Sequence, residues 1–113
     1  MHGGRVLIFG VVLLAVACSE QADLDETRRR GDRIVSALES YRTTEGEYPT
    51  TLEELTPDYL PEIPTPTWGL RTWVYEHLTD GFGLAVHESR RTGDGNAHWY
   101  AWLGPEHGWQ FGD

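Results

Sequence analysis

Cys18 carries the only thiol of this 113-residue chain, and the residues before it limit the chemistry open to it. They form an apolar run, Val6–Ala17, and Arg5 places one positive charge in front of the run. A helix of this length spans roughly 18 Å, which is too short to cross a hydrocarbon core of about 30 Å. A short apolar run behind a positive charge is instead typical of a secretory signal peptide. We therefore expect this chain to leave the cytoplasm.

Small residues end the apolar run. The tripeptide Ala-Val-Ala at 15–17 directly precedes Cys18, and this pattern resembles the lipobox of bacterial lipoproteins, with Ala15 where the commonest lipoboxes have leucine. The resemblance implies that residues 1–17 are removed as a lipoprotein signal peptide. It also implies that Cys18 becomes an acylated terminus carrying fatty acids such as palmitate. The residue after Cys18 is Ser19 and not aspartate. By resemblance to the sorting rule of Gram-negative lipoproteins, this implies that the protein lies in the outer membrane, facing the periplasm. The alternative is an ordinary signal peptide beside an incidental cysteine.

The remaining nucleophiles and bases show no catalytic arrangement. Ser89 lies two residues after His87, and this spacing on an exposed turn does not make a catalytic triad. His77, His87 and His98 would approach one another as zinc or copper ligands if their strands lie side by side, whereas histidines on a polar face need no metal. Carboxylates are abundant but scattered. We expect that the protein is not an enzyme.

The charge balance restricts the class of partner. Aspartate and glutamate number 18 against 9 basic residues, which gives a net charge of −9 at pH 7. Loss of Arg5 with a signal peptide makes the remaining chain one unit more negative. An anionic surface of this size repels nucleic acid and anionic lipid headgroups but tolerates cations and basic proteins. We expect no nucleic-acid partner.

The first element expected to position these groups is a helix over residues 25–44. Ile34, Leu38 and Tyr41 recur at four- and three-residue spacing, with Val35 beside them, so one face of the helix is apolar. Size and composition predict a tether over residues 18–24 and a single domain over residues 25–113.

Charged pairs and a glycine delimit this helix. Asp25 precedes Arg29 by four residues, and Glu26 precedes Arg30 by four, a spacing that favours ion pairs on a helix surface. Gly46 is the residue expected to end the helix.

A short helical turn and a stiff connection follow. Thr50 stands three residues before Glu53, the spacing of a capping box, and predicts one turn with Leu52 and Leu55 facing inward. Four prolines within residues 56–69 predict an extended connection, because proline lacks an amide donor and disfavours helix in the residue before it.

After residue 69 the residue types alternate with the period of two that is typical of β-strands. The alternation predicts strands over about 71–78, 82–87, 99–103 and 109–111. Consecutive strands with short connections favour an antiparallel meander, and the apolar helix face must pack on it. The expected fold class is α+β, with one N-terminal helix packed on a small three- to four-stranded antiparallel sheet.

The landmarks along residues 37–69 come in a particular order. They are Ala37-Leu38-Glu39-Ser40-Tyr41, Gly46-Glu47-Tyr48-Pro49, Leu52 and Leu55, Tyr59-Leu60, Ile63-Pro64 and Pro66-Thr67-Trp68-Gly69. This order resembles the C-terminal soluble domain of the type II secretion major pseudopilin, over about forty residues. The resemblance implies a pilin-like fold.

The chain also departs from that family. Its first carboxylate is Glu20, so the glutamate-bearing pilus helix is replaced by the lipobox-like segment, and Thr65 replaces an aspartate. The family binds calcium in the loop between its last strands, where this chain offers only Asp94 and Asn96. Two such residues are few for an ion that takes six to eight oxygens, and a glycine-rich turn is the alternative. We expect no cofactor, with calcium as the open alternative.

Two functions remain. The first is a lipid-anchored, non-enzymatic structural or interaction protein of the cell envelope, with an envelope protein as partner and a relation to type II secretion. The second is a small periplasmic lipoprotein that binds a ligand or metal on an aromatic, histidine-rich sheet face. Six rings are interaction candidates: Trp73, Tyr75, Trp99, Tyr100, Trp102 and Trp109. They cannot all lie on one face of a sheet, so two or three are expected to be exposed.

Overall fold

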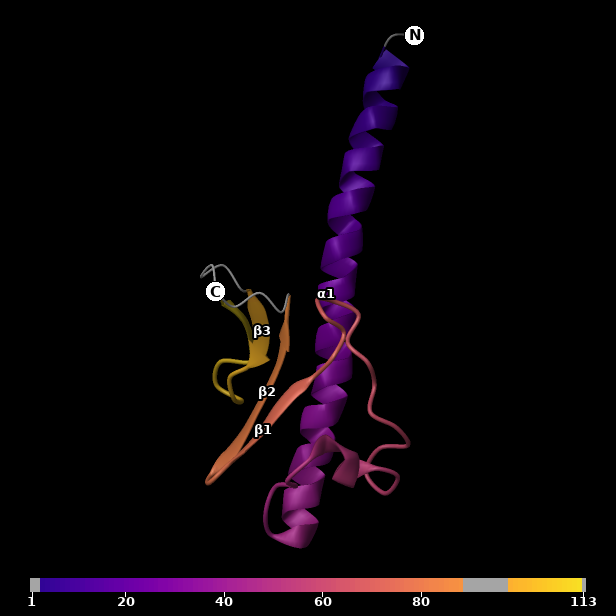
Figure 1. Cartoon of the computed structure of the whole chain (residues 1–113). Coiled ribbons are helices and arrows are strands. Elements are labelled where there is room, and N and C mark those ends of the chain that lie inside the picture. Colours follow the sequence, from indigo (N-terminus) through magenta and orange to yellow (C-terminus); the bar gives the residue numbers. More distant parts are fainter. Residues whose placement is uncertain (1–2, 89–97, 113) are drawn as a thin grey trace.

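The computed structural model describes residues 3–88 and 98–112, and of residues 3–19 only the helical backbone. Helix α1 is followed by a 3-10 turn, η1, and by four strands. Their bounds are α1 Gly3–Glu45, η1 Leu52–Leu55, β1 Val74–Leu78, β2 Gly81–His87, β3 Trp99–Trp102 and β4 Trp109–Gly112. The strands form one antiparallel sheet in the order β1-β2-β3-β4, which lies beside α1 (Figure 1). The α+β class and the meander are confirmed.

Helix α1 is longer than the sequence analysis predicted. Residues 18–24, expected to be a tether, are helical in the structure. No proline or glycine interrupts the chain between Gly10 and Gly31, and the amide of Gln21 donates a hydrogen bond to the Asp25 carboxylate at 3.1 Å, one helical turn on. Within the described residues, no helix has the combined length and hydropathy needed to cross a membrane.

The expected end of the helix is confirmed. Gly46 has a φ of 90°, the left-handed conformation that glycine adopts without steric cost. Its N–H donates to the carbonyl of Arg42 at 2.8 Å, so one of the last helical carbonyls is satisfied.

The core lies between α1, η1 and the sheet. Ile34 and Leu38 have no exposed surface, and Val35 and Tyr41 pack at the edge of the same cluster, so the predicted apolar helix face is confirmed. The buried members of the cluster are Ile34, Ala37, Leu38, Leu52, Leu55, Leu60 and Leu84.

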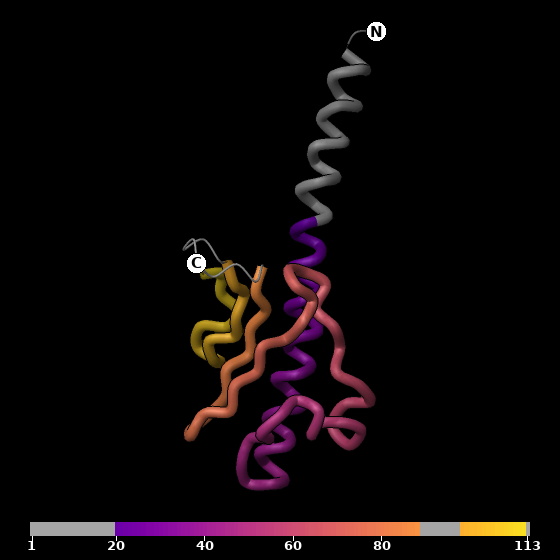
Figure 2. The backbone as a smooth tube through the Cα atoms, viewed as in Figure 1, coloured from indigo at the N-terminus to yellow at the C-terminus, as the bar shows by residue number. Residues whose placement is uncertain are grey.

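The segment between the helix and the sheet contributes two leucines to this core. Leu52 and Leu55 are buried as expected, but the turn is capped one residue later than the sequence predicted. The N–H of Thr51, and not of Thr50, donates to the Glu54 carboxylate at 2.8 Å. Figure 2 follows the chain from α1 through this turn and the proline-rich connection to β1.

The register of the strands assigns each side chain to a face, because directly opposed residues project to the same side of a sheet. Tyr75 lies opposite Leu84, Leu84 opposite Trp102, and Trp102 opposite Trp109. Since Leu84 belongs to the core, this is the face that packs against α1. The open face carries the alternate residues, among them Ala85 opposite Ala101.

Candidate functional site

The six aromatic candidates do not form an exposed binding surface. Five of them lie on the helix-facing side, and Trp99 alone projects from the open face, where its ring covers Gly112. All six side chains are half-buried. The expectation that two or three rings would be exposed is therefore wrong, because the rings pack on one another and on the helix.

The packing of these rings centres on Trp109. Its centroid lies 6.0 Å from that of Trp73, 5.4 Å from Tyr100 and 5.9 Å from Trp102. These separations fall in the range in which aromatic pairs attract each other. Gly31 on α1 provides the space, since a Cβ there would collide with the Trp109 ring.

The polar ends of three of these half-buried rings are satisfied by backbone carbonyls or by a side chain of α1. Trp73 Nε1 donates to the carbonyl of Pro64 at 2.6 Å, and the Tyr75 hydroxyl donates to that of Pro49 at 2.6 Å. Trp109 Nε1 donates to Asp32 Oδ1 on α1 at 2.7 Å. Burial, followed by the nearby charge of Glu54, raises the pKa of Tyr75 to about 12. These hydrogen bonds hold the three rings against the rest of the fold, so their role in the structure is packing.

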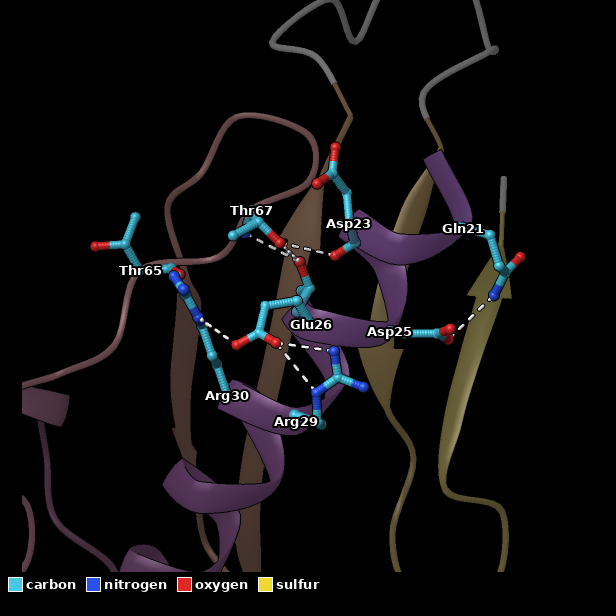
Figure 3. A network of polar contacts seen from close by, with 9 residues as sticks. Gln21, Asp23, Asp25, Glu26, Arg29, Arg30, Thr65 and Thr67 are labelled. Carbon is cyan, nitrogen blue, oxygen red and sulfur yellow. Dashed lines mark hydrogen bonds and ion pairs between the residues drawn. The ribbon is translucent and has the colours of Figure 1, made fainter. Parts of the chain in front are cut away.

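A polar network attaches the proline-rich connection to α1 (Figure 3). Glu26 pairs with Arg29 at 2.9 Å and with Arg30 at 3.0 Å, and hydrogen bonds from the two guanidinium groups lower the pKa of its carboxyl. The expected Glu26–Arg30 pair is confirmed, but the partner of Arg29 is Glu26 and not Asp25, whose carboxylate accepts the bond from Gln21.

Two further bonds of this network reach across more than thirty residues of sequence. Arg30 Nη1 donates to the carbonyl of Thr65 at 2.7 Å. Thr27, which has no exposed surface, accepts the N–H of Thr67 at 3.0 Å. Arg30 and Thr27 therefore connect α1 to the proline-rich connection, whereas Arg29 pairs with Glu26 on α1 itself.

The histidines are not brought together. His77 lies opposite Phe82 near the β1–β2 turn, while His87 lies opposite Trp99 at the other end of β2. The strand alternation also places His77 and His87 on opposite faces. His98 lies 3.9 Å from the carboxylate of Glu88. Across the described residues, no three His, Cys, Asp or Glu side chains form a group that could hold a metal.

Four candidates from the sequence lie wholly or in part outside what the structure describes. Asp94 and Asn96 fall in the undescribed residues 89–97, and so does Ser89. Cys18 lies on α1, but its side chain belongs to the part of the helix for which only the backbone is described. The calcium alternative and the lipidation of Cys18 therefore stay predictions.

A groove of about 460 Å³ is a candidate binding site in the described chain. It lies where the β1–β2 and β3–β4 turns approach the last turns of α1. Its volume is within the range of ligand-binding pockets, about 300–1,000 Å³. The apolar part of its lining is formed by Tyr48, Leu78, Phe82, Trp102, Leu103 and Pro105. Glu39 from α1 and Asp80 from the β1–β2 turn add two carboxylates.

One aromatic pair organises the groove wall. The rings of Tyr48 and Phe82 meet edge to face with centroids 5.0 Å apart. The Tyr48 hydroxyl donates to Glu39 Oε1 at 2.8 Å, which holds both groups in place. Burial of Tyr48 and this hydrogen bond raise the pKa of its hydroxyl above the ordinary value of 10.0. Among the described residues, the lining of the groove contains no serine, cysteine or histidine, and it offers apolar contact area and two carboxylates.

Of the residues that line this groove, only Trp102 was a candidate from the sequence. Tyr48, Phe82 and Asp80 come from separate elements, and each has an ordinary sequence role at a helix exit, in a strand or in a turn. The only available signal was the pair of glycine-containing turns at Asp80 and Gly104. Their approach to Glu39 depends on how the sheet packs on α1.

Comparison with known proteins adds no assignment: no family model, curated protein or solved structure matches this chain.

Proposed function

We propose that this protein is a lipid-anchored binding protein of the bacterial cell envelope, with a non-enzymatic role in protein interaction. The observation that carries the proposal is the apolar run Val6–Ala17 ending in Ala-Val-Ala-Cys18. Two or three acyl chains on one cysteine give stable membrane attachment, whereas a single chain binds reversibly. The described domain that follows is small and carries a groove suited to binding.

A relation to type II secretion is the narrower part of the proposal. It rests on the ordered Tyr, Gly, Pro and Trp landmarks of residues 37–69. One helix followed by an antiparallel meander is an order of elements compatible with a pseudopilin-like domain. In this proposal the lipid anchor replaces the pilus-forming helix, so the protein acts beside a secretion assembly and does not polymerise.

The anchor is tested by expressing the full chain in a Gram-negative host and comparing it with the Cys18→Ser variant. The expected result is a membrane-bound protein whose intact mass corresponds to the chain from Cys18 plus acyl groups. The variant should retain residues 1–17 and the unmodified mass. A Ser19→Asp variant is the matched control for sorting: it should stay acylated but move from the outer to the inner membrane fraction. Unmodified wild-type protein in the soluble fraction would end the proposal.

A further inference from the structure

The groove between Glu39, Tyr48, Phe82 and Trp102 combines two features that favour positive charge. Three aromatic rings line it, and the face of an aromatic ring carries negative electrostatic potential. Cations over such faces gain about 0.5–1 kcal/mol at exposed sites and about 2 kcal/mol or more when desolvated. The remaining apolar lining can accept an aliphatic stem.

The two charged side chains among the described residues that line the groove are both acidic, although the guanidinium of Arg42 lies 5.3 Å from the centroid of the Tyr48 ring. Glu39 and Asp80 both line the groove, and none of its lining residues, all of them in the described part of the chain, is basic. The chain as a whole has a net charge of −9, so its field attracts cationic groups toward the molecule. Among the described lining residues an anionic ligand would meet two carboxylates and three aromatic rings.

The protein already uses one groove ring to hold a guanidinium. The Cζ of Arg42 lies 5.3 Å from the centroid of the Tyr48 ring, within the range of a cation–π contact. Arg42 lines a neighbouring hollow of about 300 Å³, which shares Tyr48, Leu78 and Asp80 with the groove. The same ring and carboxylate therefore border both spaces.

The apolar rim indicates a macromolecular source for the cation. The rim includes Leu78 and Leu103, which line the groove and are 44% and 46% exposed. A small free cation would leave this rim in water. A protein that inserts one basic side chain would cover the rim with its own surface.

We propose that this groove receives the side chain of an arginine or lysine presented by a basic protein partner. The aliphatic stem lies against Phe82 and Trp102, and the charged head lies beside the carboxylates of Glu39 and Asp80. This inference rests on the proposed function, because it names the chemistry of the envelope partner.

The experiment titrates the full chain in detergent with a short peptide containing arginine at alternate positions. The matched ligand contains citrulline, which keeps the shape of arginine but lacks its charge. Binding is followed by the indole N–H signal of Trp102 in a nitrogen-labelled sample, assigned by its loss in Trp102→Phe. The site variant is the double change Glu39→Gln with Asp80→Asn. The charge-matched control is Asp58→Asn with Glu62→Gln, two exposed carboxylates on the proline-rich connection.

The expected result is a saturable shift of the Trp102 signal with the arginine peptide. Binding should be at least tenfold weaker for the citrulline peptide and for the site variant. The control variant should bind the arginine peptide as the wild type does. Equal binding of the site variant, or no binding of the arginine peptide, would overturn the inference. Choline is titrated separately, and binding as tight as that of the peptide would assign the groove to a small cation instead. Because acylation of Cys18 is measured by mass, failure here is distinguishable from failure of the anchor.

Discussion

Trp109 of β4 lies directly on Gly31 of α1, and a Cβ at residue 31 would occupy the space of its ring. The Trp73 ring is also close, at 3.1 Å from the same point. A glycine in a helix costs about 1 kcal/mol relative to alanine, yet α1 continues through it without interruption. The contact explains why glycine suits this position, since it lets the sheet approach the helix.

The change Gly31→Ala is therefore expected to destabilise the protein, although alanine is the better helix former. The gain in helix propensity is about 1 kcal/mol, and overpacking of a core contact costs about 1–3 kcal/mol. Thermal unfolding followed by circular dichroism should show a lower melting temperature. Gly81→Ala is the control, because a Cβ there meets no atom within 4 Å. A higher melting temperature for Gly31→Ala would show that the ring does not pack as described.

The change Leu38→Ala should remove one of the fully buried side chains of the core. Such truncations cost about 2–5 kcal/mol, because the lost transfer free energy adds to the cost of the cavity. This is a large part of the stability of a small domain, about 5–15 kcal/mol. Denaturant unfolding should show the loss, with Ser40→Ala on the exposed side of α1 as the control. An unchanged midpoint for Leu38→Ala would contradict the packing of α1 on the sheet.

Local patterns in the sequence were sufficient to predict the elements and the class of the fold. The alternation of Tyr75 with Val74 predicted a strand, and the spacing of Ile34 and Leu38 predicted the buried helix face, because both depend on periodicity alone. The capping box begins at Thr51 and not at Thr50. The sequence could not distinguish the two, because each threonine stands three residues before a glutamate.

The site could not be predicted in the same way. The aromatic rings were expected to be exposed because a strand pattern shows which residues share a face but not how well neighbouring rings cover them. Trp109 is shielded by Gly31, which is 78 positions earlier in the chain. The groove likewise joins Glu39 to Phe82 through tertiary packing, for which the sequence holds no local signal.

Acid should weaken the attachment of the proline-rich connection to α1. The pKa of Glu26 is lowered from its ordinary value of 4.5 by its hydrogen bonds to Arg29 and Arg30. A carboxyl whose pKa is depressed in the folded state contributes stability above its unfolded pKa, and that contribution is lost as the pH falls below about 4.5 through the folded pKa. Melting temperatures should therefore fall less steeply between pH 5 and pH 3 in Glu26→Gln than in the wild type. Glu62→Gln, an exposed carboxylate on the connection, should follow the wild type. Parallel curves for Glu26→Gln and the wild type would show that the pair does not stabilise the fold.

High pH should destabilise the fold by ionising the hydroxyl of Tyr75. Burial raises the pKa of this hydroxyl from 10.0 to about 12, and the hydroxyl donates to the Pro49 carbonyl at 2.6 Å. A group whose pKa is raised on folding contributes stability that is present below the unfolded pKa, and this contribution is lost as the pH rises from about 10 through about 12.

The change Tyr75→Phe should cost about 0.5–1.5 kcal/mol at neutral pH, the typical net value of one hydrogen bond. It should also make stability fall less between pH 10 and pH 12, as measured by denaturant unfolding at each pH. Tyr59→Phe is the control, a half-buried tyrosine on the connection. If Tyr75→Phe and the wild type lost stability in parallel above pH 10, the Tyr75 hydroxyl would not be buried against Pro49.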